Sequence, residues 1–288
     1  MQPKQHFLMT EMSENIKRTV LDYNDIAGMV PQLAGHEKLV NKVIHWISLD
    51  KVNAVHDKYC DNPGPEFTRN LLKDFDIKLK VDGQEVLDHL PEGAFITVSN
   101  HPFGALDGIS LISLIGSIRP DFKVMVNMVL NHISAMRPNF IAVDALASDD
   151  PAKKAVSMKG IKEAIMQVRR GKPIGFFPAG AVSKINRKLR IEDREWQPSI
   201  IRLIQQLNVP VIPIYFHGHN SVWFNILGLI DWRLRTLRLP AEVWRKCHTD
   251  IHISVGDIIS PEELGKYPDV ADLGKFLKSE TYKLRDRR

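Results

Sequence analysis

The sequence is poor in cysteine and lacks any long apolar run. Its 288 residues include two cysteines, Cys60 and Cys247, which supply neither a disulfide framework nor the paired spacing of a zinc site and suit a reducing compartment. The first residues, MQPKQHFLMTEMSENIKR, lack the continuous apolar core of a secretory signal peptide. No window reaches the roughly 18 uninterrupted apolar residues of a membrane-spanning helix. We therefore expect a cytoplasmic protein that contacts the inner face of the membrane peripherally at most.

The net charge is +5, which is too small to indicate a nucleic-acid-binding protein, so no nucleic-acid partner is expected. The positive charge is uneven, because Lys184–Arg190, Arg233–Arg238 and the C-terminal KLRDRR are all basic. The last two mix leucine with arginine, as segments that adsorb to anionic lipid headgroups do. Solvated helix faces have the same composition, so both interpretations remain open.

The pattern of the chain changes near residue 76, and the chain has neither repeats nor low-complexity segments. Residues 14–60 carry apolar side chains at helical spacing, and a further helix is expected near 67–75 after the break at 61–65. Beyond residue 76, short β-rich runs alternate with helical stretches, which favours an α/β domain with a mixed, largely parallel sheet flanked by helices. We predict an N-terminal helical region over 1–75 and an α/β domain over 76–288. Strands are expected at 77–81, 94–98, 123–127, 140–143, 174–177, 211–216 and 251–255, and helices at 109–118, 152–170 and 198–207.

The turn SNHPFGALDG, which follows the strand expected at 94–98, contains His101 and Asp107. Histidine is suited to take a proton near neutral pH, and a carboxylate on its other ring nitrogen would fix the tautomer and stabilise the imidazolium. The residues also have a structural interpretation, since aspartate is a preferred N-cap and Asp107 precedes an apolar helical run that starts at Gly108. A GxSxG motif is absent. If the pair is catalytic, the base acts directly on a substrate hydroxyl or amine.

Two later segments also follow expected strands. In PIGFFPAGAVSK (173–184), Gly180 gives the backbone freedom to present N–H groups to an anion or oxyanion, although an ordinary strand-to-loop transition has the same composition. In NVPVIPIYFHGHNS (208–221), His217 and His219 have the spacing of a metal pair on a strand. No obvious carboxylate or cysteine nearby completes a site, so we interpret them as part of a polar loop and expect no metal.

Taken in order, the NH…D turn, FFPAGAVS and VPVIPI resemble the motifs of the glycerolipid acyltransferase family over about residues 95–220. The second motif should fall at NFIAVDA, residues 139–145. The form NHPxGxxDG resembles a branch that contains aminolipid O-acyltransferases and proteins called putative haemolysins. The resemblance implies O-acyl transfer from an acyl thioester, carried by acyl carrier protein or coenzyme A, to the hydroxyl of a lyso-lipid. No tightly bound cofactor is implied.

The resemblance also implies roles for individual residues. His101 resembles the general base that deprotonates the acceptor hydroxyl, and Asp107 resembles its orienting carboxylate. Four apolar residues would suit an acyl-chain tunnel, although core packing explains them equally well: Phe103, Leu106, Ile109 and Phe176. The residues expected to bind substrate are Asn100, Gly104, Phe177, Pro178, Gly180, Ser183, Lys184, Arg187 and Pro213.

Two of the motifs differ from the family pattern in residues that bear on the substrate. The family's third motif is typically Phe-Pro-Glu-Gly-Thr-x-Ser, whereas this chain has Ala179 and Ala181 at the Glu and Thr positions and Val182 where a basic residue often stands. Ala145 stands where the second motif commonly has arginine. The usual phosphate-binding side chains are thus missing, and a buried phosphate without an arginine partner would be costly.

These differences favour an acceptor whose head is a carboxylate rather than a phosphate. We expect a lyso-aminolipid of the N-acyl amino acid type with a hydroxy fatty acid, its carboxylate held by the basic run Lys184–Arg190. 1-Acylglycerol-3-phosphate is the second choice, since that run could hold a phosphate from another side. A catalytically silent, membrane-associated lipid-binding protein is the alternative from another class. A further departure is that five residues rather than four separate His101 from Asp107.

Overall fold

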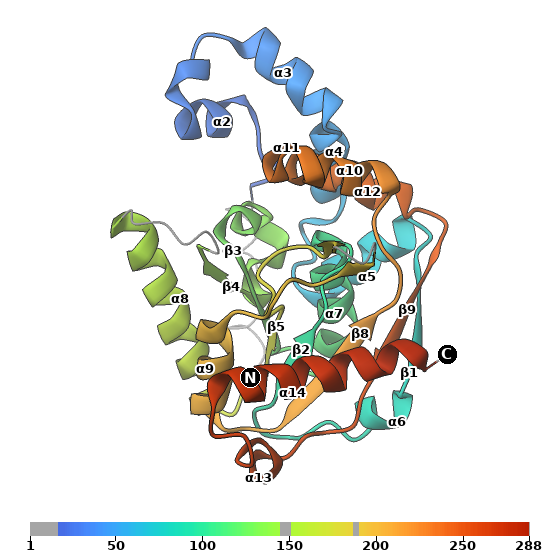
Figure 1. The fold of residues 1–288 in the computed structure, drawn as a ribbon. Coiled ribbons are helices and arrows are strands. Elements are labelled where there is room, and N and C mark those ends of the chain that lie inside the picture. Colours follow the sequence, from blue (N-terminus) through green and yellow to red (C-terminus); the bar gives the residue numbers. More distant parts are fainter. Residues whose placement is uncertain (1–16, 145–150, 187–189, 288) are drawn as a thin grey trace, which may run out of the picture.

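Seven strands form one mixed sheet at the centre of the molecule (Figure 1). In the computed structural model, which describes residues 17–144, 151–186 and 190–287, their order is β1-β9-β8-β2-β5-β3-β4. The strands from β8 to β4 are mutually parallel, whereas β9 runs antiparallel to β8 and parallel to β1. The predicted fold class is therefore confirmed. The strands are β1 Lys78–Asp82, β2 Ile96–Ser99, β3 Lys123–Asn127, β4 Phe140–Val143, β5 Ile174–Phe176, β8 Val211–Phe216 and β9 Asp250–Val255.

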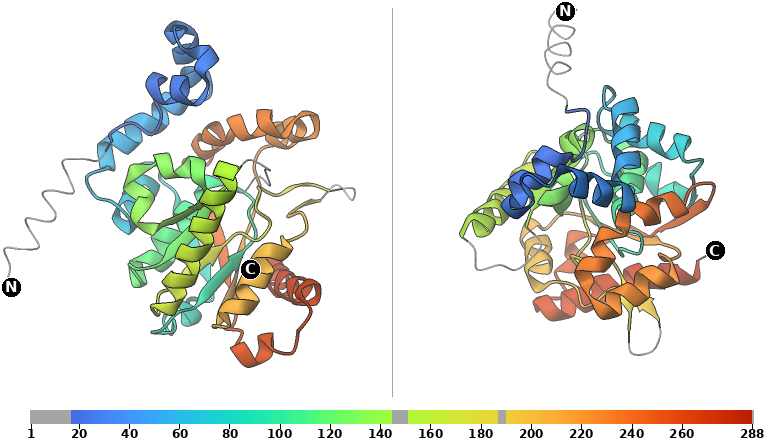
Figure 2. Two further views of the ribbon diagram at one scale, coloured as in Figure 1. Left: turned by 90° about the vertical axis from the view of Figure 1, so that its left-hand side faces the viewer. Right: turned by 90° about the horizontal axis from the view of Figure 1, so that it is seen from above.

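Helices cover both faces of the sheet. Helices α5 and α7 pack on one face, and α8, α9 and α14 pack on the other (Figures 1 and 2). In β3, Val124 and Val126 belong to the first core and Met125 to the second, because successive strand side chains point to opposite faces. Strands that are buried on both faces consist of nearly continuous apolar residues, so they could be predicted from the sequence. The bounds are α5 Pro65–Asp74, α7 Ala105–Ile118, α8 Pro151–Arg169, α9 Pro198–Leu207 and α14 Val270–Lys283.

The expected strands and helices are confirmed, with shifts of a few residues at their ends. The largest shift is in α7, which begins at Ala105 rather than near residue 109. The sequence analysis missed the hairpin of β6 Lys184–Ile185 and β7 Ile191–Glu192, whose strands are too short to show a period. It also missed several helices of the second half of the chain. These are α10 Val222–Ile230, α11 Trp232–Leu237, α12 Leu239–Arg245 and α13 Pro261–Leu264, together with α14.

The described part of the N-terminal region, residues 17–75, is largely helical, as expected, and residues 1–16 of the predicted region lie outside the described residues. It contains α2 Tyr23–Met29, α3 Glu37–Trp46 and α4 Leu49–Tyr59, and Figure 2 shows α2 and α3 standing out from the body of the molecule. A small separate core holds α3 to the start of α4, whereas Val55 of α4 and Phe67 of α5 join the main core beside α7. One core therefore spans the predicted boundary near residue 75, and the division into two domains stays a prediction.

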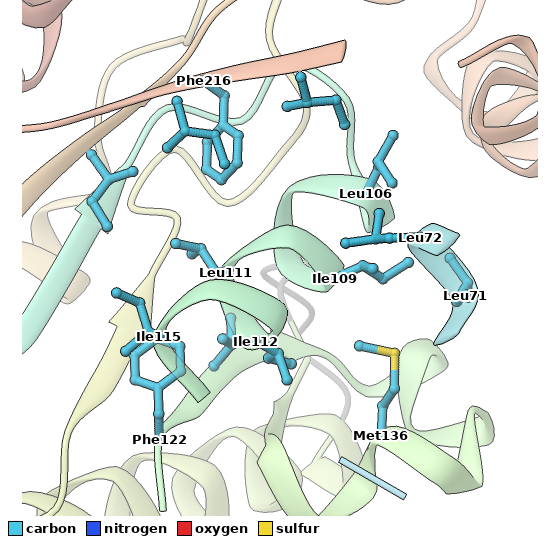
Figure 3. Close-up of a cluster of buried hydrophobic side chains, with 14 of the residues drawn as sticks. Leu71, Leu72, Leu106, Ile109, Leu111, Ile112, Ile115, Phe122, Met136 and Phe216 are labelled. Carbon is cyan, nitrogen blue, oxygen red and sulfur yellow. The ribbon is translucent and has the colours of Figure 1, made fainter. Parts of the chain in front are cut away.

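Helix α7 is mostly buried, and its packing fixes the turn that precedes it. Leu106 and Ile109 lie against Leu71 and Leu72 of α5, and Phe216 at the end of β8 lies above the same helix (Figure 3). A fully buried leucine or isoleucine contributes about 1.5–3 kcal/mol relative to an exposed one. The start of α7, where Asp107 lies, is thus held by tertiary packing and not only by local helix preference.

Candidate active site

Three neighbouring parallel strands bring predicted site residues to one edge of the sheet. The carboxyl ends of β8, β2 and β5 lie side by side, and they are followed by His217, by Asn100 and His101, and by Phe177. Asn100 connects two of these ends, because its Oδ1 accepts the N–H of Phe216 at 2.7 Å and its Nδ2 donates to the carbonyl of Phe216 at 2.9 Å. The turn that carries His101 therefore leaves the sheet from a fixed point.

His101 and Asp107 are in contact. Nδ1 of His101 lies 2.9 Å from Oδ2 of Asp107, so the extra residue between them does not separate the pair. Gly104 lets the turn accommodate the extra residue, because its φ of +84° is a backbone conformation that favours glycine. The approach is not aligned as a regular hydrogen bond, as is common in active sites without substrate. The side chain of Asp107 is fully buried and that of His101 is 18% exposed, which leaves Nε2 as the nitrogen for a substrate proton.

Asp107 also supports the first turn of α7. Its Oδ2 accepts the N–H groups of Phe103 and Gly104, each at 2.9 Å, and Gly104 is the N-cap. The expectation that Asp107 itself caps a helix starting at Gly108 is wrong in position, because the helix begins earlier. The same carboxylate nevertheless contacts both the backbone at the helix start and the His101 ring. Burial raises the pKa of Asp107, while His101 and the two backbone N–H groups act to lower it.

Phe177 fixes the plane of the His101 ring. The two rings stack with their centroids 4.3 Å apart and 29° between their planes. Phe177 follows β5 directly, and its carbonyl accepts the N–H of Gly180 at 2.9 Å. The N–H of Gly180 is therefore paired, whereas those of Ala181 and Val182 donate to no backbone carbonyl in the described part of the chain. If this loop stabilises an oxyanion, Ala181 and Val182 are the better donors.

A second buried carboxylate, Asp193, belongs to the site and was missed by sequence reasoning. Its Oδ1 accepts the backbone N–H of His101 at 3.2 Å and the hydroxyl of Ser183 at 2.6 Å. Its Oδ2 accepts the indole N–H of Trp196 at 3.2 Å. Burial raises the pKa of Asp193, opposed chiefly by the Ser183 bond and by the charge of His101. Its sequence context, IEDREW, contains no recognisable motif, and its partners lie up to 92 residues away.

Several predicted substrate-binding residues are engaged in the protein itself. Asn100 and Ser183 are buried and bonded to Phe216 and Asp193, and the N–H of Ser183 donates to the carbonyl of His101 at 2.8 Å. Pro178 is buried, and its carbonyl accepts the N–H of Gln197 at 2.9 Å. These residues shape the loop around His101, and their contact with substrate stays a prediction.

The remaining expected residues lie around the site or away from it. Lys184 is exposed on β6, while Arg187 of the same basic run, like Ala145 of the second motif, lies outside the described residues. The ring of Pro213 packs near Gly256 and Leu284 and does not lie beside the dyad. The four residues considered for an acyl tunnel are buried within the two cores, as the packing interpretation requires: Phe103, Leu106, Ile109 and Phe176.

The two histidines after β8 have separate partners. Nε2 of His217 lies 2.8 Å from the Ser254 hydroxyl, and Nδ1 of His219 lies 2.8 Å from the carbonyl of Asn220. Within the described ranges, no three histidine, cysteine or acidic side chains gather in a way that could hold a metal ion. Among the same residues, no helix has the length and apolar character needed to cross a membrane.

The chain is similar to several known proteins. A family model described as "Acyltransferase" matches residues 25–287. Two proteins named lyso-glycine lipid O-acyltransferase are similar to the chain. The one from Bacteroides thetaiotaomicron is 26% identical over 85% of this chain and 88% of its own length, and the one from Phocaeicola vulgatus is 25% identical over 85% and 87%. The crystal structure of the 1-acyl-sn-glycerophosphate acyltransferase PlsC from Thermotoga maritima superposes with a TM-score of 0.45 at 16% identity, covering 77% of this chain and 83% of that one.

Proposed function

The chain belongs to the acyltransferase family, and from this premise we propose that it transfers a fatty acyl group from an acyl thioester to the hydroxyl of a lyso-aminolipid. The observation that carries the proposal is the His101–Asp107 pair, in contact at 2.9 Å and placed where three parallel strands end. The family match extends well beyond the motif region at 95–220, since it includes residues 25–287.

The proposed reaction proceeds in one displacement. His101 takes the proton of the acceptor hydroxyl through Nε2 as the oxygen attacks the thioester carbonyl carbon. A tetrahedral intermediate forms, with its oxyanion near the N–H groups of Ala181 and Val182. When the carbon–sulfur bond breaks, the imidazolium returns the proton to the departing thiolate. The products are an ester and a free thiol, and the step uses no metal and no tightly bound cofactor.

The surroundings of His101 suit a base of this kind. A carboxylate beside Nδ1 fixes the tautomer that leaves Nε2 unprotonated, and it stabilises the imidazolium that forms during the reaction. The stacked Phe177 ring restricts rotation of the imidazole. The backbone of His101 is held on two sides, by Asp193 at its N–H and by Ser183 at its carbonyl. Such preorganisation lowers the entropic cost of reaching the transition state.

The acceptor class rests on two lines of support. The third motif has Ala179, Ala181 and Val182 where phosphate-handling family members have polar or charged residues. Two relatives that align with 85% of the chain are named for acyl transfer to a lyso-glycine lipid, whose headgroup carries a carboxylate and no phosphate. A lyso-lipid built on an amino acid is therefore the acceptor we propose. We propose acyl carrier protein or coenzyme A as the carrier of the acyl group.

Helix α10 supports a peripheral position at the membrane. Its apolar side chains face solvent to an unusual degree, with exposed fractions of 67% for Trp223, 69% for Leu229 and 72% for Ile230. Figure 1 shows α10, α11 and α12 together beyond the strand ends that carry the dyad, and the basic segment 233–238 lies in the same place. Tryptophan, aliphatic and arginine side chains together suit a lipid surface. We propose that the protein works from the cytoplasmic face of the membrane.

Turnover by the purified protein tests the proposed function. The assay supplies acyl carrier protein and coenzyme A thioesters with either a lyso-glycine lipid or 1-acylglycerol-3-phosphate. We expect ester formation with the lyso-glycine lipid, reduced about 10²–10⁴-fold in His101→Ala. A marked preference for 1-acylglycerol-3-phosphate would contradict the aminolipid acceptor. Absence of thioester consumption with every acceptor would favour a silent lipid-binding protein.

Vesicle binding tests the membrane position separately. Wild-type protein should co-sediment with vesicles that contain anionic phospholipid, and a Trp223→Ser, Leu229→Ser double variant should remain in the supernatant. A matched control replaces Trp46 on α3, which is 62% exposed and lies far from the dyad in sequence. Equal binding by the α10 double variant and the wild type would rule out α10 as the contact.

A further inference from the structure

Arg235 on α11 is a half-buried cation that pairs with no acidic side chain of the described residues. Its Nη2 donates to the carbonyl of Val182 at 3.0 Å, and its Nη1 donates to the carbonyl of Ser183 at 3.2 Å. In the described part of the chain, no carboxylate lies within ion-pair distance of its guanidinium. Burial and the neighbouring positive charge of Arg194 lower the pKa of Arg235. A desolvated cation that no anion compensates is unfavourable unless a ligand supplies the charge.

A second guanidinium is held on the same loop. Nε of Arg194 donates to the carbonyl of Ala179 at 2.7 Å. The loop from Ala179 to Ser183 thus has arginines on its carbonyls at both ends. Carbonyl partners fix the position of a guanidinium without neutralising it, so the positive charge persists beside the loop.

Arg235 keeps hydrogen-bonding capacity for a ligand. A guanidinium has five N–H groups in a planar fork, and the protein uses two of them. The Phe224 ring lies 5.2 Å from Cζ of Arg235 and limits its movement. Three donors on a restrained fork suit a planar carboxylate, which accepts two parallel hydrogen bonds.

One residue connects Arg235 to the base. Ser183 donates its N–H to the carbonyl of His101 at 2.8 Å, and its own carbonyl accepts from Arg235. In an N-acyl glycine with a hydroxyl on the third carbon of the acyl chain, seven bonds separate the hydroxyl oxygen from a carboxylate oxygen. Extended, that distance is about 8 Å, roughly the length of two residues of backbone. A ligand that uses both residues would place its hydroxyl at His101 and its carboxylate at Arg235, on the other side of Ser183.

We propose that Arg235 binds the carboxylate of the acceptor headgroup, with Arg194 adding positive charge. This inference rests on the proposed function and names the residue that recognises the acceptor. It replaces the expectation that the basic run Lys184–Arg190, in which Lys184 is exposed, holds the carboxylate. It also gives the basic segment Arg233–Arg238 a second purpose, since Arg235 is directed to the loop beside His101 and not only to a lipid surface.

The test compares an acceptor with and without its negative charge. Wild-type protein and Arg235→Met are assayed in detergent micelles with an N-(3-hydroxyacyl)glycine and with its methyl ester. Wild type should prefer the acid, and Arg235→Met should lose about 30-fold or more in kcat/KM on the acid while changing the rate on the ester about threefold at most. Arg235→Lys, which keeps the charge without the fork, should fall between them on the acid.

Arg238→Met is the matched control. It removes a positive charge from the same segment, and toward the described ranges of the chain Arg238 makes backbone hydrogen bonds only. It should retain wild-type selectivity. Equal losses on acid and ester in Arg235→Met would show that Arg235 only clamps the loop, and the inference would fail. If Arg235→Met does not fold, the test relies on Arg235→Lys and on the preference of the wild type. Equal wild-type rates on the acid and on its methyl ester would overturn the role of Arg235. A wild type inactive on both acceptors would instead overturn the proposed function.

Discussion

Two buried carboxylates contact His101, the proposed base, and they do so in different ways. Asp107 belongs to the same turn as His101 and contacts the imidazole ring. Asp193 comes from the loop after β7 and contacts the backbone N–H of His101, the hydroxyl of Ser183 and the indole of Trp196. We therefore propose that Asp107 sets the charge and tautomer of His101, whereas Asp193 holds the turn and the third-motif loop in position.

The difference between them has a structural origin. Asp107 satisfies donors within its own turn, so its position follows from local sequence and from the packing of α7. Asp193 joins segments that are distant in sequence, and its own N–H donates to the hydroxyl of Tyr282 on α14 at 2.8 Å. A carboxylate that tunes chemistry can thus be encoded locally, whereas one that assembles the site depends on the completed fold.

Among substitutions that separate the two carboxylates, Asp107→Asn should have the largest effect. The amide keeps an oxygen for the N–H groups of Phe103 and Gly104, but it cannot stabilise an imidazolium by charge. We expect kcat to fall about 100-fold or more while the melting temperature changes little. Steady-state kinetics and thermal unfolding measure the two quantities. If stability falls and turnover is kept, Asp107 is only part of the helix cap.

Asp193→Asn should lower stability more than activity, the reverse of what we expect for Asp107→Asn. One of its two oxygens becomes an N–H₂ group facing a donor, so a buried hydrogen-bond network is broken. We expect the free energy of unfolding to fall by about 2–3 kcal/mol and kcat to fall about tenfold at most. Urea unfolding measures the first, with the exposed Asp257→Asn as control. A loss of kcat as large as that of Asp107→Asn would end the distinction between the two carboxylates.

Phe177→Leu tests how much the stacked aromatic ring contributes to orienting His101 beside the two carboxylates. The substitution removes the stack on His101 and leaves both carboxylates in place. Since an aromatic pair contributes about 0.5–1.5 kcal/mol, kcat should fall about 3–10-fold with KM nearly unchanged. Phe276→Leu is the matched control, because Phe276 stacks on Tyr267 with centroids 4.2 Å apart. An unchanged kcat in Phe177→Leu would mean that Asp107 alone orients the ring.

The smallest effect concerns pH, and it involves a buried group outside both carboxylate loops. His56 links the carbonyl of Arg18 to Ser134 and Ala135, and burial lowers its pKa. Below about pH 6.5, His56 takes up a proton in the unfolded chain more readily than in the folded chain. The free energy of unfolding therefore decreases as the pH falls. Between pH 7.5 and 5.5 we expect a loss of about 1 kcal/mol, measured by urea unfolding.

His56→Gln should show a flatter pH profile than wild type, and His45→Gln, at an exposed position, should keep the wild-type slope. Equal slopes in all three proteins would show that His56 does not carry the pH dependence. The ratio of kcat between the two aspartate variants should stay constant over this range, because His56 contacts neither carboxylate loop.

The parts of the molecule that could be predicted are those with local signatures. Most strands of the sheet read as apolar runs, although β1 and β9 include charged or polar residues. The His101–Asp107 turn lies within one short segment, and its order with two later motifs indicated a site. Asp193 and Arg235 could not be found in this way. Their partners are as far as 92 and 53 residues away. The segment around Asp193 has no recognisable motif, and the segment 233–238 stood out only for its positive charge, which does not single out Arg235. The acyl-chain tunnel stays a prediction for a related reason, since apolar composition does not distinguish a tunnel lining from a packed core.

Asn100 has a consequence that reaches beyond the site. Its side-chain amide offers Phe216 one acceptor and one donor, which is what a peptide group would offer. The side chain thereby imitates one more rung of the β2–β8 ladder after the main chain has turned away. The backbone of His101 is free to leave the sheet without exposing an unpaired strand end. Asn100→Asp would keep the shape but set a carboxylate oxygen against the carbonyl of Phe216, so the imitation depends on the amide nitrogen.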